Sequence, residues 1–199
     1  MRSTKRRSAD QGPPRAVLIN GTVGVGKTAV AEAVGGILAQ MQVPNAVIDV
    51  DWLRRAWPSP QGDRFNGSLA LRNLTAVTRN YVEAGAARLV LAGVVETRSD
   101  REGFEEALGI PLVLCRLRAD PPVIRERLSR RHGEDREALE WHLHRAPELD
   151  AVLDATAVDD FSIDVSRATV ANAALEIVRA LGWSTGEAGT NSDSTAGVG

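Results

Sequence analysis

Cysteine and long apolar runs are scarce in this chain of 199 residues. The single cysteine, Cys115, lies in the apolar stretch "PLVLCRL", so no internal disulfide can form and a reducing compartment is expected. No apolar stretch is long enough to cross a bilayer, and the N-terminus lacks the apolar core of a signal peptide. We therefore expect a cytoplasmic protein with no membrane partner.

Excess positive charge is lacking as well. The formal net charge is -2 at pH 7, whereas a general nucleic-acid binder usually carries a strongly basic domain or stripe. Nucleic acid is therefore not expected as a partner, while a small anionic ligand is compatible with this charge. Only two of the 24 lysines and arginines are lysines, Lys5 and Lys27. Because arginine replaces lysine almost everywhere, we expect Lys27 to stand where a guanidinium does not fit.

Composition separates the two ends of the chain from its middle. Residues 1–14 are basic and end in prolines, residues 184–199 are small and polar, and both segments are predicted to be disordered. The basic end could contact RNA or an acidic partner, although a solvated arm is the simpler interpretation. The remaining residues, 15–183, have the length and apolar content of one domain with a core.

Within this domain, short apolar runs alternate with helical patterns. Such alternation is typical of an α/β fold in which helices cover both faces of a parallel sheet. Strands are predicted at 16–20, 46–49, 88–94, 112–118 and 161–165. Helices are predicted at 27–41, from about 52, at 69–84, 122–131, 137–153 and 170–181, with loops at 52–69 and 94–103.

The stretch "GTVGVGKT" matches the phosphate-binding pattern G-x-x-x-x-G-K-[ST] in full, between a predicted strand and a predicted helix. Its glycines let the backbone turn so that several N–H groups can point at phosphate oxygens. Lys27 supplies a compact cation for the β- and γ-phosphates, and the Thr28 hydroxyl can ligate Mg²⁺. The predicted nucleotide-binding residues are Gly21, Thr22, Val23, Gly24, Val25, Gly26, Lys27 and Thr28.

A second group of polar residues follows the second predicted strand, in "VIDVDWLRRAWP". Carboxylates at the end of a parallel strand lie over the ligand-binding crevice of such sheets. Asp51 could accept the proton of a substrate hydroxyl, with Arg54 one helical turn away to hold phosphoryl charge. Asp51 could instead cap a helix that starts at Trp52. Asp49 could hold a water on Mg²⁺.

These motifs resemble the small P-loop kinases of the nucleoside-monophosphate-kinase-like superfamily, in particular its chloramphenicol phosphotransferase-like and adenylylsulfate-kinase-like branches. The resemblance implies a P-loop NTPase three-layer sandwich with a five-stranded parallel sheet and an Arg-rich lid. It assigns the catalytic carboxylate to Asp51 and a substrate-binding role to Arg54. By position, the turn at 164–169 resembles the adenine-side loop of these kinases.

The third strand departs from the family pattern. Related kinases often carry an acid at its apolar end near Mg²⁺, whereas "AGVV" stands there in this chain and Glu96 follows two or three residues later. Glu96 could take the role through a shifted backbone, or Asp49 could take it, or metal handling is weak.

An arginine-rich segment at about 125–146 is predicted to be the lid that excludes water and neutralises the transferring phosphoryl group. Arg127 and Arg131 share a helix face, and the glycine in "RRHGED" suggests a hinge. A solvated helix with ion pairs is the alternative. The predicted catalytic residues are Lys27, Asp51, Arg54, Arg127 and Arg131, and the predicted metal ligands are Thr28 and Asp49.

Histidines and tryptophans leave weaker signals. No cysteine or carboxylate joins the histidines at a zinc spacing, so a metal role is not expected for His132, His142 and His144. Aromatic walls suit a ring-bearing substrate, so an acceptor pocket and ordinary packing are both open for Trp52, Trp57 and Trp141.

Together these patterns predict a phosphotransferase that moves the γ-phosphoryl group of ATP to a hydroxyl of a small molecule, antibiotic-like or nucleotide-like, with Mg²⁺ as cofactor. ATP is preferred over GTP because no N-K-x-D element, which reads guanine, is present. Two alternatives are a nucleotide-binding regulatory module and an NTPase that needs no acceptor.

Overall fold

The structure is a computed structural model that describes residues 12–184. The terminal segments predicted to be disordered, 1–14 and 184–199, lie outside the described residues except at 12–14 and 184. Among the described residues, no helix combines the length and the apolar character that crossing a bilayer requires.

Five short strands form one sheet with the order β2-β3-β1-β4-β5, and every neighbouring pair is parallel. Because β1 is central, the chain that leaves it lies where the strand order reverses, which is where parallel sheets bind ligands. The strands are β1 (Arg15–Asn20), β2 (Asn45–Asp49), β3 (Arg88–Ala92), β4 (Leu112–Arg118) and β5 (Phe161–Asp164).

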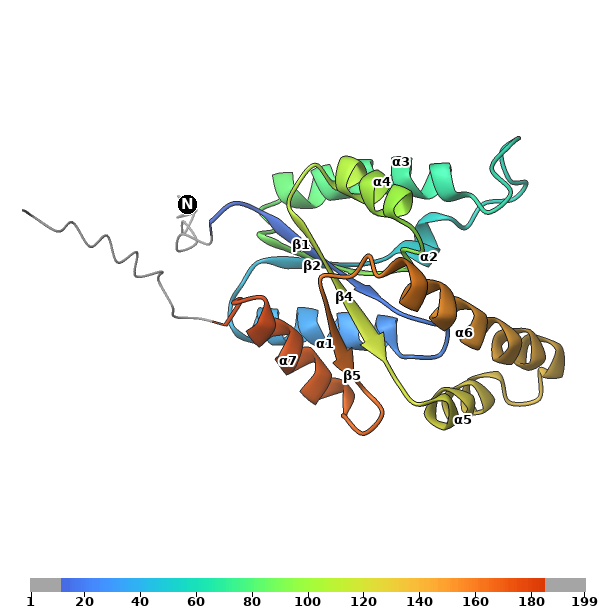
Figure 1. Ribbon diagram of the computed structural model, residues 1–199. Helices are drawn as coiled ribbons and strands as arrows, with labels where there is room; N and C mark the ends of the chain where they lie inside the picture. The colour runs from blue at the N-terminus through green and yellow to red at the C-terminus, as the bar shows by residue number, and fades with distance from the viewer. Residues whose placement is uncertain (1–11, 185–199) are drawn as a thin grey trace, which may run out of the picture.

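Helices cover both faces of this sheet, so the predicted fold class, a three-layer α/β sandwich, is confirmed. On one face lie α1 (Lys27–Gln40) and α7 (Val170–Ala180), and on the other lie α3 (Gly67–Glu83) and α4 (Arg98–Leu108) (Figure 1). Each layer packs against its own apolar cluster.

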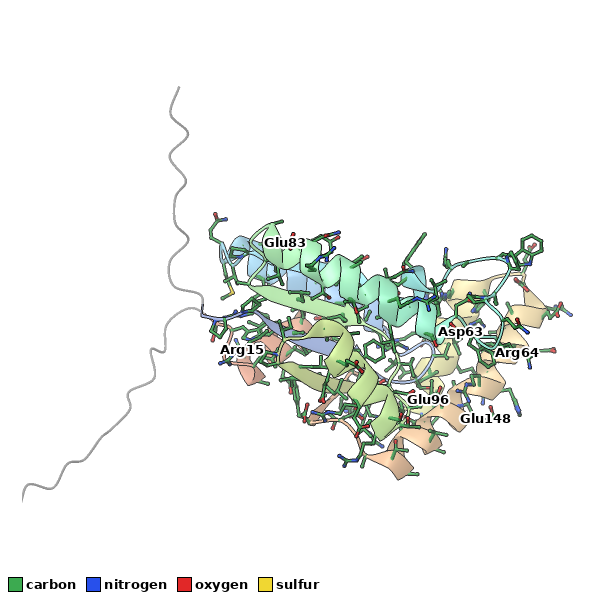
Figure 2. All side chains as sticks on the ribbon, turned by 90° about the horizontal axis from the view of Figure 1, so that it is seen from above. Arg15, Asp63, Arg64, Glu83, Glu96 and Glu148 are labelled. Atoms are coloured by element: carbon green, nitrogen blue, oxygen red, sulfur yellow. The ribbon has the colours of Figure 1, made fainter. Side chains whose placement is uncertain are left out.

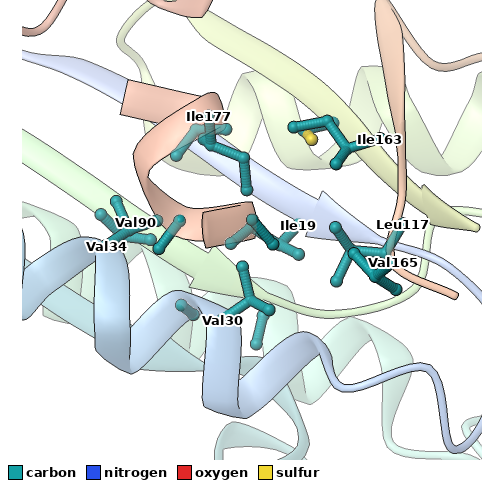
Figure 3. Packing of buried hydrophobic residues seen from close by; sticks show 14 of the residues in the cluster. Ile19, Val30, Val34, Val90, Leu117, Ile163, Val165 and Ile177 are labelled. Atoms are coloured by element: carbon teal, nitrogen blue, oxygen red, sulfur yellow. The ribbon is translucent and has the colours of Figure 1, made fainter. Parts of the chain in front are cut away.

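The central strand β1 supplies side chains to both clusters because successive residues of a strand point to opposite faces. Val17 and Ile19 belong to the cluster under α1 and α7, and Ala16 and Leu18 belong to the cluster under α3 and α4. Figure 3 shows Ile19 in the first cluster, between the sheet and the two helices. A strand buried on both faces explains the continuous apolar run that precedes the glycine-rich loop.

Two further helices, α5 (Pro121–His132) and α6 (Arg136–Thr156), extend beyond the carboxyl ends of the strands (Figure 1). The buried Arg116 of β4 donates to Asp150 Oδ1 at 2.7 Å and to Asp154 Oδ1 at 2.9 Å. These contacts tie the second half of α6 to the sheet.

Helix α4 was not predicted, because residues 94–103 read as a loop. Its sequence is strongly charged, yet Phe104 and Leu108 turn inward against α3. A capping box starts it: Thr97 accepts a hydrogen bond from the backbone N–H of Asp100, and Asp100 accepts one from the N–H of Thr97. Gly109, at φ 61°, ends it. These end signals were readable in the sequence, whereas the apolar stripe was too narrow to reveal the helix.

Strand β3 ends at Ala92, two residues before the predicted Val94. Its neighbour β1 ends at Asn20, so no further strand backbone is available to pair with. The side chain of Asn20 takes over, accepting a hydrogen bond from Val95 N and donating one to Val95 O.

Replacing either of two adjacent glycines of α1 by alanine is expected to change the free energy of unfolding, in opposite directions for the two positions. A Cβ at Gly35 would collide with Cγ2 of Val47, so we expect Gly35→Ala to destabilise the fold by about 1–3 kcal/mol. Gly36 is exposed and has open space around it, so Gly36→Ala should stabilise the helix by about 0.5–1 kcal/mol. Urea unfolding of both variants measures the difference, and equal midpoints would contradict the packing of α1 on β2.

Candidate active site

The loop of residues 21–26 runs from the end of β1 to the start of α1. Gly21 and Gly24 have φ values of 135° and 81°. A Cβ on Gly21 would lie 2.7 Å from the carbonyl oxygen of Leu117, and one on Gly24 would lie 2.8 Å from Cγ of Leu128. Both backbone conformation and close approach therefore require glycine at these places. The loop has the strand-to-helix setting that the phosphate-binding motif needs.

Lys27 turns its ammonium group back over this loop. Its Nζ donates to the carbonyl oxygens of Gly21 at 2.9 Å and Thr22 at 3.0 Å. Burial lowers the pKa of Lys27 from 10.5 to about 8, against the opposing effect of two nearby carboxylates. An ammonium held by two carbonyl oxygens in the wall of a cavity can exchange them for the oxygens of an anion.

This buried ammonium is expected to make nucleotide binding depend on pH. In the free protein Lys27 loses its proton as the pH rises through about 8, whereas a bound triphosphate favours the charged form. Above pH 8, binding must therefore take up a proton, and the Kd for ATP should rise by up to about tenfold per pH unit. Below pH 8 the group is charged in both states, so Lys27 adds no pH dependence there.

Isothermal titration calorimetry measures this linkage, with ATP·Mg²⁺ at about pH 7 and pH 9 in two buffers of different ionisation enthalpy. We expect weaker binding and proton uptake at the higher pH. The same Kd at both values, without proton uptake, would contradict a buried Lys27 in the free protein.

Asp49 connects the phosphate loop to the segment after β2. The Thr28 hydroxyl donates to Asp49 Oδ2 at 2.9 Å, and the backbone N–H of Asp51 donates to Asp49 Oδ1 at 2.9 Å. Asp49 is thus the N-cap of the short helix α2 (Val50–Leu53). The alternative in which Asp51 caps a helix starting at Trp52 is wrong, because α2 begins two residues earlier.

Asp51 is left with an exposed carboxylate, since its helix is capped by its neighbour. The side chain is 69% exposed and lies in the wall of the same cavity as Lys27. Arg54 Nε lies 3.5 Å from Asp51 Oδ1, one helical turn away. A pair this exposed contributes little to stability, so its main effect is on the direction of the carboxylate.

Glu96, the late acid after β3, has a partner on α6. Arg145 Nη2 donates to Glu96 Oε1 at 2.8 Å. Figure 2 places Glu96 at the end of the molecule opposite Arg15, which begins β1, and thus at the carboxyl edge of the sheet. Of the two carboxylates open for the metal role, Asp49 is hydrogen-bonded to the phosphate-loop hydroxyl of Thr28, and Glu96 is paired with an arginine.

The two arginines on α5 that were predicted to act from a lid, Arg127 and Arg131, have different surroundings. Arg127 donates to the carbonyl oxygen of Val25 in the phosphate loop at 2.8 Å and to that of Val165 at 2.9 Å. It therefore ties α5 to the loop and to the segment after β5. Arg131, one turn later, lines the cavity and lies close enough to Lys27 to contribute to the lowering of its pKa.

Arg130 of the same segment follows the ion-pair alternative. Arg130 Nη2 and Glu126 Oε1 lie 2.6 Å apart, and the two side chains are 76% and 69% exposed. The predicted hinge lies at Gly133, which ends α5 with φ 54°. The predicted lid segment thus consists of the two helices α5 and α6, from which Arg127, Arg131, Trp141 and His142 line the cavity.

A cavity of about 770 Å³ lies along the carboxyl edge. Trp52 from α2 and Trp141 from α6 line it and are 66% and 60% exposed, while Trp57 projects into solvent at 94%. The guanidinium carbon of Arg55 lies 4.0 Å from the centroid of the Trp52 ring. The wall also includes residues of the phosphate loop, of the segments after β2 and β3, and of the predicted adenine-side turn: Val23, Gly24, Val25, Gly26, Lys27, Thr28, Asp49, Asp51, Val94, Val165, Ala168 and Thr169.

Asn20 was missed by the sequence interpretation. It is fully buried at the end of β1, directly before the phosphate loop, and accepts a hydrogen bond from Gly21 N at 2.9 Å. The available signal was an asparagine that ends an otherwise apolar strand, since a buried amide must find partners.

The histidines make ordinary contacts. His132 and His142 stack with their ring centroids 4.4 Å apart, and His144 lies 3.1 Å from Glu148. Within residues 12–184, no group of three or more histidine, cysteine or acidic side chains is arranged to hold a metal ion.

No protein-family model matches the chain, and no curated protein matches it. Solved structures do match. The tunicamycin resistance protein of Deinococcus radiodurans is 20% identical, with a TM-score of 0.63 over 85% of this chain and 96% of that one. Shikimate kinase of Acinetobacter baumannii, in complex with shikimate, is 19% identical, with a TM-score of 0.58 over 89% and 98%.

A third solved structure is the APS kinase CysC of Mycobacterium tuberculosis in complex with AMPPNP and APS. It is 18% identical, with a TM-score of 0.57 over 86% of this chain and 99% of that one. In all three cases nearly the whole of the other chain superposes on the described domain, which includes the phosphate loop, the parallel sheet and the helices around it. The chain thus shares its fold with these three solved structures, and this is the fold that its sequence motifs predict.

Proposed function

We propose that this protein is an ATP-dependent phosphotransferase that moves the γ-phosphoryl group to a hydroxyl of a small molecule. The observation that carries the proposal is a single cavity that joins a complete phosphate loop to an exposed carboxylate, Asp51. Solved structures named shikimate kinase and APS kinase share the fold and support the same reaction class.

The triphosphate would lie along residues 21–28, with the loop N–H groups and the start of α1 directed at its oxygens. Lys27 would leave the carbonyl oxygens of Gly21 and Thr22 for the β- and γ-phosphates. Arg131, already in the cavity wall, would add charge from the lid at 125–146. The base would lie against Val165 and Ala168, at the predicted adenine-side turn.

Mg²⁺ prefers hard oxygen ligands, and the Thr28 hydroxyl and the Asp49 carboxylate offer two of them in contact with each other. These residues fit the ion. Thr28 would be a ligand of Mg²⁺, and Asp49 would either be a ligand itself or hold a water that is bound to the ion. When bound, Mg²⁺ would neutralise charge on the β- and γ-phosphates.

Asp51 would accept the proton of the acceptor hydroxyl. The hydroxyl oxygen would then form a bond to the γ-phosphorus as the bond from that phosphorus to the β–γ bridging oxygen breaks, leaving ADP. Arg54 would fix the orientation of the Asp51 carboxylate. Because this carboxylate is exposed, it would otherwise rotate freely.

The acceptor would be ring-bearing, either antibiotic-like or nucleotide-like. Trp52 is next to Asp51 in sequence, and it lines the cavity with most of its surface free. A hydroxyl placed at Asp51 brings the body of its molecule against this ring and against Arg55, which stacks on it.

The proposal is tested by incubating the protein with ATP·Mg²⁺ and a panel of hydroxyl-bearing antibiotics, nucleotides, sugars and adenylylsulfate. Mass spectrometry then reports which compound gains a phosphoryl group. We expect one chemical class to be phosphorylated. ATP binding without any phosphorylated product would favour a regulatory module. ADP released equally in every well would indicate an NTPase that needs no acceptor.

A further inference from the structure

We propose that Asn20 is a positioning residue that fixes the phosphate loop and the loop after β3 relative to each other. Nucleotide binding at the first loop is then transmitted to the acceptor side of the cavity. The inference rests on the proposed phosphotransferase function for its catalytic consequence, although the coupling between the two loops can be measured without any acceptor.

The Asn20 amide uses all of its hydrogen-bonding positions. Its Oδ1 accepts from Gly21 N at 2.9 Å and from Val95 N at 3.1 Å. Its Nδ2 donates to Val95 O at 3.0 Å and to Asp159 Oδ1 at 2.8 Å. The side chain is fully buried, so water cannot replace any of these partners without entering the core.

The Asp159 carboxylate sets the orientation of the amide. An ionised carboxylate only accepts hydrogen bonds, so Nδ2 must point toward it and Oδ1 toward Gly21. Burial raises the pKa of Asp159, while the hydrogen bond from Asn20 and the charge of Arg116 lower it. The Asn20 amide thus holds the partly buried Asp159 carboxyl, and the Asp159 carboxyl in turn orients the amide.

Both loops that meet at Asn20 face the cavity. Gly21 begins the phosphate loop, and Val94, beside the anchored Val95, is part of the cavity wall. The next residue, Glu96, is held by Arg145 of α6. The loop after β3 is therefore tethered on one side to the phosphate loop and on the other side to α6.

This arrangement predicts a specific loss when the amide is changed. Asn20→Asp keeps the size of the side chain and the acceptor for Gly21 N, but it removes both donated hydrogen bonds and places a carboxylate oxygen against Val95 O and Asp159, which repel it. The loop after β3 should shift while the phosphate loop still folds. A displacement of about 1 Å is enough to reduce catalysis roughly 100-fold. Nucleotide affinity should stay within about threefold of the parent protein, since Gly21 N keeps its acceptor.

The first experiment follows the backbone amide signals of Val95 and Glu96 by NMR while ADP·Mg²⁺ is added. In the parent protein and in Asn20→Asp, urea unfolding and ADP affinity are measured alongside. Asn80→Asp, an exposed amide-to-acid change on α3, is the matched control. We expect both amide signals to respond to ADP in the parent protein and in the control, and the response to be lost in Asn20→Asp.

A reversed pair separates positioning from simple loss of structure. In the double variant Asn20→Asp with Asp159→Asn, the new amide at 159 can donate to the new carboxylate at 20, so part of the response should return. A full response in Asn20→Asp would overturn the proposal, and so would a double variant no better than the single one.

Catalysis supplies the last readout. With an acceptor from the panel, Asn20→Asp should lower kcat about 100-fold with little change in the KM for ATP. If no acceptor is phosphorylated by the parent protein, the phosphotransferase function fails, while the NMR response still decides the coupling. If the parent protein is active and kcat is unchanged in Asn20→Asp, the positioning role is wrong.

Discussion

Replacement of Lys27 by alanine is expected to abolish phosphoryl transfer, with a loss of at least about 1,000-fold, because it removes the cation that lies over the phosphate loop. In the structure the Lys27 ammonium is bonded to Gly21 O and Thr22 O, and both are carbonyls that phosphate oxygens can displace. Steady-state kinetics with the acceptor identified in the panel measure the loss.

Lys27→Arg is the sharper variant, because it keeps the charge. Lys27 places one point charge between two loop carbonyls, and a planar guanidinium cannot do the same. We therefore expect Lys27→Arg to be nearly as inactive as the alanine variant, although arginine replaces lysine almost everywhere else in this chain. Arg130→Ala, which removes an exposed cation paired with Glu126, is the control and should retain activity. An active Lys27→Arg enzyme would show that charge alone is sufficient at this place.

Asp51→Asn is expected to lower kcat by about 100- to 10,000-fold while leaving the affinity for ATP nearly unchanged. The amide keeps the size of the side chain but cannot accept the hydroxyl proton. Because Asp49 rather than Asp51 caps α2, the substitution at 51 removes no cap and should not destabilise the helix. Pre-steady-state kinetics, together with ATP titration, separate the chemical step from binding.

The control for this variant is Glu83→Gln, an acid-to-amide change at the end of α3 whose carboxylate is 70% exposed. It should behave like the parent protein. If Asp51→Asn kept its full rate, the acceptor hydroxyl would have to lose its proton to another group, and the proposed role of Asp51 would be wrong. A raised ATP Kd with an unchanged kcat would instead place Asp51 at the nucleotide.

The phosphate loop could be predicted from the sequence because its requirements are local. Gly21 and Gly24 need positive φ and close backbone approach, and both needs show as glycines at a fixed spacing before Lys27. The parallel sheet was equally readable, since strands buried on both faces have continuous apolar runs. The helix α4 was missed because its apolar side is only a narrow stripe, although its capping box and final glycine were present.

The distribution of roles among the acidic residues needed coordinates. Asp49 and Asp51 are two residues apart, and either could cap α2 or face the cavity as far as spacing shows. The hydrogen bond from Thr28 reaches Asp49 and leaves the Asp51 carboxylate exposed. Glu96 could be placed near the phosphate loop or away from it, and its pair with Arg145 became visible only when α6 was positioned.

What the sequence determined by itself is therefore the fold, the phosphate loop and the set of polar residues that gather at the carboxyl edge of the sheet. These follow from short-range backbone needs and from apolar periodicity, which are written along the chain. Only the tertiary structure decided which of these polar residues meet. Asn20 contacts Val95 and Asp159 across 75 and 139 residues, and such partners are chosen by packing between distant segments, on which the local sequence carries no information.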